Sequence, residues 1–224
     1  HTSSWGTSTR MIGGVIMTHG DDSGLILPPR IAPYQIVIVP IPRGNWQETV
    51  LPRAREIKAE LEAAGMRVMI DDRDGYTPGW KYAEWELRGV PLRFEIGPKD
   101  LEKGQVFAAR RDTREKFAIP FEGIAAATQA KLDEIQAALL ARARAFREEN
   151  TREAATWEEF VALMEGRPGF VIASWCGSAE CEAKIKAETQ ATLRNIPMGS
   201  PRVEGTCVHC GGPSEVKAWF AKAY

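Results

Sequence analysis

The chain has 224 residues, which is enough for two domains of ordinary size with apolar cores. Hydrophobic residues are 44% of the total and charged residues 26%, as in most globular proteins, and no stretch approaches the roughly 18 uninterrupted apolar residues that a membrane span needs. The formal net charge of -1 excludes a protein that binds nucleic acid through bulk positive charge, so any RNA contact must come from a local basic patch.

The first 30 residues combine an apolar segment with turn-forming residues. The chain begins HTSSWGTSTR, with neither an initiating Met nor the basic and apolar stretches of a secretory signal, and we interpret it as a fragment that opens inside a domain. Residues 11–17 predict a short apolar helix. Pro28, Pro29 and Pro33 then indicate a linker, because proline removes a backbone donor and forces its neighbours into extended conformations.

A βαβ unit is predicted next. Residues 35–41 form a short β-branched apolar run, which is typical of a strand buried on both faces of a parallel sheet. A helix is expected over residues 47–64, with Pro52 in its first turns and Gly65 at its C-terminal cap. Residues 66–70 complete the unit as a second strand. The apolar stripe of the helix consists of Val50, Ala54, Ile57, Leu61 and Ala64.

The next helix has clear start and stop signals. Thr77 offers an N-cap hydroxyl, Pro78 suits the first helical position and Gly89 marks the end. Residues 91–96 alternate between apolar and charged side chains, and residues 105–111 predict a further strand. Together these elements predict a small α/β domain with a mixed sheet.

The C-terminal part begins with a long helix, predicted over residues 124–150 from one narrow apolar stripe. Thr156 and Glu159 match a capping box, and residues 170–173 predict a strand that runs into the first cysteine pair. The residues of the stripe are Leu132, Ile135, Leu139, Ala143 and Phe146.

All the cysteines lie in the last fifty residues, in the patterns C-x4-C and C-x2-C. They are Cys176, Cys181, Cys207 and Cys210. Two such loops can complete a tetrahedral site of four thiolates, and a site without an open position is structural rather than catalytic. Disulfides and redox chemistry are the alternatives. We expect His209, inside the second loop, to face solvent. Residues 182–201 read as a mixed-charge helix and a turn without a basic stripe, so DNA binding is not expected.

The N-terminal segment resembles a known motif. Trp5-Gly6-Thr7-Ser8-Thr9-Arg10, followed by the apolar helix, Thr18-His19-Gly20-Asp21 and Leu27-Pro28-Pro29-Arg30, is similar to the third signature motif of class II aminoacyl-tRNA synthetases. More narrowly, it resembles the prolyl enzyme of the archaeal and eukaryotic type, because Thr9 stands where the general motif has glutamate. The resemblance implies that Arg10 is catalytic and binds ATP, with Ser8 also in the ATP pocket. An arginine suits this role because it offers five rigid donors and a permanent charge.

Three further segments, 33–40, 81–98 and 106–116, resemble the class IIa anticodon-binding domain of the prolyl, threonyl, histidyl and glycyl enzymes. Unstacked RNA bases need donors and acceptors for their edges. The resemblance implies that Arg93 donates to a guanine, that Glu86 or Glu95 accepts from one, and that Lys116 adds positive charge. Proline anticodons end in two guanines.

Beside these residues we expect a positive ridge of Arg110, Arg111, Arg114 and Lys116 that suits phosphates. Solvated ion pairs on the open face of a sheet are the alternative interpretation. The cysteine-containing extension resembles the final zinc domain of the prolyl family, in which the chain ends in a tyrosine whose carboxylate reaches toward the active site, as Tyr224 would here. The alternative interpretation is that this aromatic residue has only a structural role and packs a terminal helix.

The predicted fold is therefore α/β, in three parts: the end of a class II catalytic antiparallel sheet (1–30), an anticodon-binding domain with a mixed sheet (31–123), and a linker helix with a zinc-binding α/β domain (124–224). The resemblance implies a cytoplasmic, homodimeric proline–tRNA ligase that joins proline to tRNA(Pro) in two steps, using ATP with magnesium, and that has a structural zinc ion.

Dimerisation would use the missing catalytic region, the fragment alone would be inactive, and neither membrane nor DNA is a partner. The alternatives are a non-catalytic tRNA-binding module of the same fold, another class IIa synthetase, and a zinc-stabilised domain without an RNA role.

Overall fold

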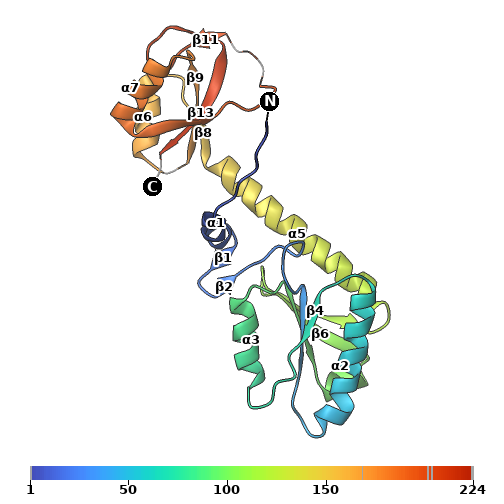
Figure 1. Ribbon diagram of the computed structural model, residues 1–224. Helices are drawn as coiled ribbons and strands as arrows, with labels where there is room; N and C mark the ends of the chain where they lie inside the picture. Colours follow the sequence, from blue (N-terminus) through green and yellow to red (C-terminus); the bar gives the residue numbers. More distant parts are fainter. Residues whose placement is uncertain (1, 168, 201, 203, 223–224) are drawn as a thin grey trace. The chain divides into compact units, whose positions relative to one another are not determined.

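In a computed structural model the chain forms two compact units, His1–Ala141 and Arg142–Tyr224, each built around one main sheet (Figure 1). The structure describes residues 2–167, 169–200, 202 and 204–222. Tyr224, the predicted terminal tyrosine, lies outside these residues. Over the described ranges, no helix is both long enough and apolar enough to cross a membrane.

The first unit opens with the predicted apolar helix, α1 (Arg10–Thr18), followed by the antiparallel pair β1 (Gly20–Asp21) and β2 (Gly24–Leu25). No residue of α1 is buried, and Met11, Ile12 and Met17 are each more than 60% exposed. In contrast, β2 packs tightly on the helix that follows. A Cβ on Gly24 would lie 2.4 Å from the backbone of Leu87, and a Cβ on Gly89 would lie 2.6 Å from Leu25.

A five-stranded sheet in the order β4-β3-β5-β6-β7 forms the centre of this unit. Its strands are β3 (Ile36–Pro40), β4 (Val68–Ile70), β5 (Leu92–Ile96), β6 (Gln105–Arg110) and β7 (Lys116–Pro120). β3 is buried along its whole length and is parallel to β4 and β5, whereas β5, β6 and β7 pair antiparallel. The predicted mixed sheet is thus confirmed, and β7 is an additional strand.

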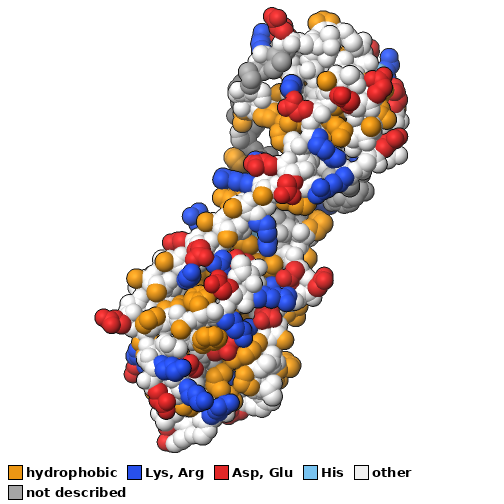
Figure 2. All heavy atoms as spheres, turned by 180° about the vertical axis from the view of Figure 1, so that it is seen from behind, with side chains coloured by type: hydrophobic (Ala, Val, Ile, Leu, Met, Phe, Trp, Pro, Cys, Tyr) orange, Lys and Arg blue, Asp and Glu red, His pale blue; other side chains and the backbone are white. Residues whose placement is uncertain are grey.

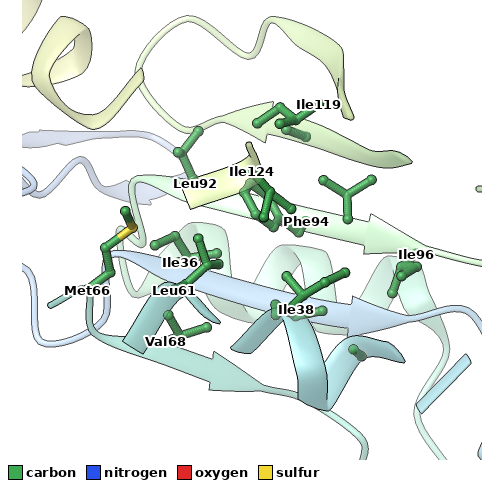
Figure 3. Close-up of a cluster of buried hydrophobic side chains, with 14 of the residues drawn as sticks. Ile36, Ile38, Leu61, Met66, Val68, Leu92, Phe94, Ile96, Ile119 and Ile124 are labelled. Atoms are coloured by element: carbon green, nitrogen blue, oxygen red, sulfur yellow. The ribbon is translucent and has the colours of Figure 1, made fainter. Parts of the chain in front are cut away.

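Helices lie on both faces of this sheet (Figure 1). They are α2 (Trp46–Ala63), α3 (Pro78–Leu87), the short α4 (Pro98–Glu102) and α5 (Ile124–Glu149). The predicted stripe of α2, apart from the exposed Ala64, and the first half of α5 bury their apolar side chains with Ile36, Ile38 and Phe94 in the main core (Figure 3). On the opposite face, α3 packs Trp85 against Val37 and Val39. The α5 stripe is buried at Leu132, Ile135 and Leu139, but Ala143 and Phe146 are exposed.

The predicted start and end of α3 are confirmed. The Thr77 hydroxyl accepts a hydrogen bond from the Trp80 amide at 3.3 Å, Pro78 is the first helical residue, and Gly89 has a positive φ of 74° just after the helix. α3 covers only part of the sheet face on which it packs. On that same face, β5 and β6 therefore stay open beside the helix.

The second unit contains a four-stranded sheet in the order β10-β13-β9-β8. The strands are β8 (Thr151–Glu153), β9 (Phe170–Trp175), β10 (Ala191–Asn195) and β13 (Val216–Lys222), with a separate hairpin of β11 (Gly205–Thr206) and β12 (Pro213–Ser214). The alternative of a terminal helix does not hold for the described residues, because Val216–Lys222 is a strand between β9 and β10. β10 is likewise a strand that the sequence reading missed.

Two helices, α6 (Trp157–Glu165) and α7 (Ala179–Thr189), complete the second unit. The predicted capping box of α6 is confirmed, since the Thr156 hydroxyl accepts from the Glu159 amide at 3.2 Å. Phe160 of α6 and Phe220 of β13 meet edge to face with ring centroids 5.3 Å apart in the core of this unit. On the face in view in Figure 2, basic and acidic side chains are interspersed rather than gathered into one basic surface.

Candidate functional site

The four cysteines come together in the second unit. Cys176 directly follows β9, and Cys181 lies in the first turn of α7, where the Ser178 hydroxyl accepts from the Cys181 amide at 3.4 Å. Cys207 and Cys210 lie in the tight turn after β11, closed by a 3.0 Å hydrogen bond from the Gly211 amide to the Cys207 carbonyl. The four sulfur atoms all lie within 4.8 Å of one another.

The sulfur spacing fits a shared metal ion rather than disulfides. The Sγ atoms of Cys181 and Cys207 are 3.6 Å apart, and those of Cys176 and Cys210 are 3.7 Å apart. Four thiolates at about 2.3 Å from one tetrahedral zinc ion lie about 3.8 Å from each other, whereas disulfide sulfurs are about 2.05 Å apart. The donor set and its spacing are therefore those of a closed four-thiolate site.

The thiols have different environments. Burial raises the pKa of Cys181 and of Cys176. Burial also acts to raise the pKa of Cys207, but backbone amides of Cys210, His209 and Cys176 donate to its sulfur and lower its pKa to about 6. Amides that stabilise a thiolate in this way prepare the turn to bind a cation.

His209 braces this cluster, so the expectation that it faces solvent is wrong. Its side chain is 14% exposed. The ring nitrogen Nδ1 lies 3.6 Å from Cys181 Sγ, Nε2 lies 3.0 Å from Glu188 Oε1, and the ring meets Trp157 edge to face at 4.6 Å. The imidazole therefore ties the cysteine turn to α6 and α7.

A second cluster lies on the open sheet face beside α3 in the first unit. The guanidinium of Arg93 donates to Glu86 Oε1 at 2.8 Å and to Glu95 Oε1 at 3.0 and 3.2 Å. Its carbon lies 3.9 Å from the ring centre of Tyr82, and Lys116 Nζ lies 3.9 Å from Glu95 Oε1. All four residues predicted to contact the anticodon are thus neighbours, and Glu86, Arg93 and Lys116 line a hollow of about 300 Å³.

These residues are exposed to different degrees. The Arg93 side chain is 8% exposed and that of Glu95 is 15%, but Glu86 is 40% exposed and Lys116 is 51%. A ligand at this surface therefore meets a carboxylate and an ammonium group first, over a buried arginine that fixes the carboxylates.

The predicted positive ridge is only half correct, because Arg110 and Arg111 are buried in ion pairs. Arg110 donates to both carboxylate oxygens of Asp112, at 3.0 and 2.8 Å, and also pairs with Glu134. Arg111 donates to both oxygens of Asp21, at 2.9 and 2.5 Å. A buried guanidinium needs such partners, so these two charges are neutralised by carboxylates and stabilise the fold, although both residues also line the hollow.

The remaining ridge residues are Arg114 and Lys116, whose side chains are 66% and 51% exposed. The hydrogen bond to Arg111 is the main cause that lowers the pKa of the Asp21 carboxyl to about 2. This pair joins the β1–β2 segment to the end of β6, so the N-terminal segment is anchored next to the open face.

Two residues of this site were not found from the sequence. Tyr82 lines the hollow under Arg93, and its spacing of four from Glu86 on one helix was the available signal. Asp71 is 2% exposed and positions α3 by accepting hydrogen bonds from Trp85 and Arg73, each at 2.8 Å. Burial alone would raise the pKa of Asp71, but these hydrogen bonds lower it to about 2.

The residues predicted to bind ATP are not part of either cluster. Ser8 directly precedes the helical turn and Arg10 is the first residue of α1, and both side chains are exposed. The Ser8 carbonyl accepts from the Met11 amide at 3.1 Å, which starts the helix.

Comparisons with known proteins cover both units of the chain. A family model described as anticodon binding domain matches residues 35–131, and one described as prolyl-tRNA synthetase, C-terminal, matches residues 157–224. The chain is 51% identical to proline–tRNA ligase 2 of Clostridioides difficile strain 630, in an alignment that covers 100% of this chain. Over its whole length the chain is therefore similar to part of the prolyl-tRNA synthetases.

Two other relatives place it in the same part of the prolyl-tRNA synthetase chain. Proline–tRNA ligase of Acetoanaerobium sticklandii is 48% identical over 100% of this chain, and that of Chlorobium luteolum is 49% identical over 99%. The alignments cover 46%, 46% and 47% of the three relatives, so the chain spans about half the length of the prolyl-tRNA synthetases that it matches. The narrower assignment to the archaeal and eukaryotic type stays a prediction.

Proposed function

We propose that this chain supplies the anticodon-reading and C-terminal parts of a proline–tRNA ligase, which joins proline to tRNA(Pro) at the expense of ATP. The observation that carries the proposal is the cluster of Glu86, Arg93, Glu95 and Lys116 on the open sheet face, inside the residues that match the anticodon-binding model. The same proposal includes the domain limits. They are 1–30 for the end of the catalytic domain, 31–123 for the anticodon-binding domain, and 124–224 for the linker helix and C-terminal domain.

The cluster has the chemistry that guanine recognition requires. The Watson–Crick edge of guanine carries two adjacent donors, which a carboxylate accepts well, and an oxygen acceptor, which a cation can satisfy. Glu86 is the more exposed carboxylate and takes the accepting role, while Lys116 and Arg114 are free enough to contact backbone phosphates. Arg93 holds both carboxylates in place and is one of the residues that line the hollow.

Within the complete enzyme, Ser8 and Arg10 are proposed to contact ATP, with magnesium bound to its phosphates. Their exposure at the start of α1 leaves both side chains accessible to a ligand. Since the chain spans about half the length of its relatives, we propose that these 224 residues alone do not activate proline and that homodimer contacts lie in the other half.

The four cysteines are proposed to hold a structural zinc ion. Cys176, Cys181, Cys207 and Cys210 would bind it as thiolates, at sulfur spacings that already suit a tetrahedron. The ion would tie the end of β9, the first turn of α7 and the β11 turn together, and its role would be to stabilise the fold.

Aminoacylation by the complete enzyme tests the proposal. With tRNA(Pro) whose two anticodon guanines are replaced, kcat/KM should fall at least tenfold, and Glu86→Ala in the enzyme should remove most of that difference. Arg55→Ala, a change of an exposed arginine on α2, is the matched control and should leave the ratio intact. If the enzyme does not distinguish the two tRNAs, or if Glu86→Ala leaves the preference unchanged, this site does not read the anticodon.

A further inference from the structure

One face of the four-stranded sheet in the second unit is not covered by α6 and α7. Strand residues alternate, and Val171, Ala173, Ala218 and Phe220 are buried in the core with α6 and α7. Their neighbours along the strands point to the other face. Among them Phe170, Ile172 and Trp219 are only half buried, and Trp219 is paired with Ile172 across the β13–β9 ladder. Large apolar side chains at partly exposed sheet positions often mark a binding surface.

A hollow of about 590 Å³ lies at one end of this face. The residues that line it are Arg147, Phe170, Arg194, Asn195, Pro197 and Trp219. The rings of Phe170 and Trp219 meet edge to face with centroids 5.4 Å apart and an angle of 62° between their planes. The two rings, one from β9 and one from β13, form an aromatic surface at the bottom of the hollow.

The walls of the hollow are cationic and polar. A register shift between Leu193 and Asn195 interrupts the pairing of β10 with β13, and there Arg194 Nη2 donates to the Ala221 carbonyl at 3.3 Å. Arg147 is exposed, with its nearest carboxylate, Glu148, 3.7 Å away. None of the described residues that line the hollow carries a carboxylate.

We propose that this hollow binds an unstacked nucleotide of single-stranded RNA. The two rings offer a stacking surface, the two arginines suit a phosphate, and the Asn195 amide can both donate to and accept from a base edge. A small inorganic anion would not use the two aromatic rings, and an apolar peptide would bring no anionic group to the two arginines. The site needs no anticodon recognition, so it stands apart from the function proposed above.

Crosslinking and titration of the 224-residue chain with one short RNA test the proposal. The probe is a labelled hexanucleotide of adenine and cytosine with one 4-thiouridine, which offers no guanine to the Glu86 site. We expect ultraviolet crosslinks at Phe170 or Trp219. In fluorescence anisotropy, Trp219→Leu and Arg194→Gln should each weaken binding about tenfold, as loss of a stacked base or of a phosphate contact does.

Arg55→Gln, a change of an exposed arginine on α2 in the first unit, is the matched control and should leave the hexanucleotide affinity unchanged. Arg194 is exposed, so its variant keeps the test valid even if Trp219→Leu impairs folding. Crosslinks confined to residues 2–141, or an affinity that neither variant changes, would overturn the proposal. Displacement of the RNA by an equal concentration of AMP would overturn its RNA part, because a free nucleotide would then be the ligand. A duplex form of the same strand should bind more weakly.

Discussion

Replacing Arg93 by alanine should be costly, because its guanidinium is the shared partner of two carboxylates. The side chain is 8% exposed and contacts Glu86, Glu95 and the ring of Tyr82. Removing one member of a buried ion pair costs about 3–5 kcal/mol, and loss of the cation–π contact adds about 1 kcal/mol. The 40% exposure of Glu86, and Lys116 at 3.9 Å from Glu95, reduce the penalty. We expect about 3 kcal/mol.

Urea unfolding followed through NMR amide signals of β3 and β5 measures this cost in the first unit alone. Arg55→Ala removes an exposed arginine that is 3.8 Å from Asp72 and should change stability by less than about 0.5 kcal/mol. Arg93→Ala combined with Glu95→Ala should cost at least about 1 kcal/mol less than the sum of the two single changes, since the double variant leaves one carboxylate fewer unpaired. Additivity of the two changes, or a cost of Arg93→Ala no larger than that of Arg55→Ala, would refute the reasoning.

Three further predictions concern other parts of the chain. Cys181→Ser should abolish binding of one zinc ion per chain, measured by atomic absorption, and should reduce hydrogen-exchange protection of β9 and β13 but not of β3; metal retained by the variant would contradict the four-thiolate site. Asp71, with its pKa lowered from 3.8 to about 2, contributes about 2 kcal/mol of stability that is present above about pH 4 and lost as the pH falls toward 2. Acid unfolding of Asp71→Asn should lack this component, and an unchanged acid profile would argue against it. Gly89→Ala should destabilise the first unit more than Gly65→Ala, because both glycines have a positive φ but only the Cβ at 89 would clash, at 2.6 Å from Leu25. Equal melting temperatures for these two variants would count against the tight packing of β2 on α3.

Local sequence signals predicted the elements whose formation depends on local chemistry. The β-branched run predicted β3 of the βαβ unit, and the Thr77, Pro78 and Gly89 signals predicted α3 after it. The cysteine spacing predicted a four-thiolate cluster, because each pair of thiols is held by one short turn or one helix start.

Ion pairs and strand pairings between residues far apart in the chain could not be predicted from local sequence signals. Arg111 is neutralised by Asp21, ninety positions away, and Arg110 by Glu134, twenty-four positions away, so the predicted ridge seemed more basic than it is. The terminal segment that includes β13 was considered as part of a helix, but pairing with β9 and β10 on both sides stabilises Val216–Lys222 as a strand. The alternation of Ala218 and Phe220 with Lys217 and Trp219 was the period-2 signal for that strand.

The most direct test of anticodon reading by this chain is a double-mutant cycle with an anticodon stem–loop of tRNA(Pro). Replacing each anticodon guanine by inosine removes only the 2-amino group, which the carboxylate of Glu86 is proposed to accept. Isothermal titration of the 224-residue chain should show at least a tenfold loss of affinity for one inosine substitution, and that loss should disappear in Glu86→Ala. An inosine effect of equal size in both proteins, or none in either, would contradict recognition of guanine by the Glu86–Arg93–Glu95 cluster.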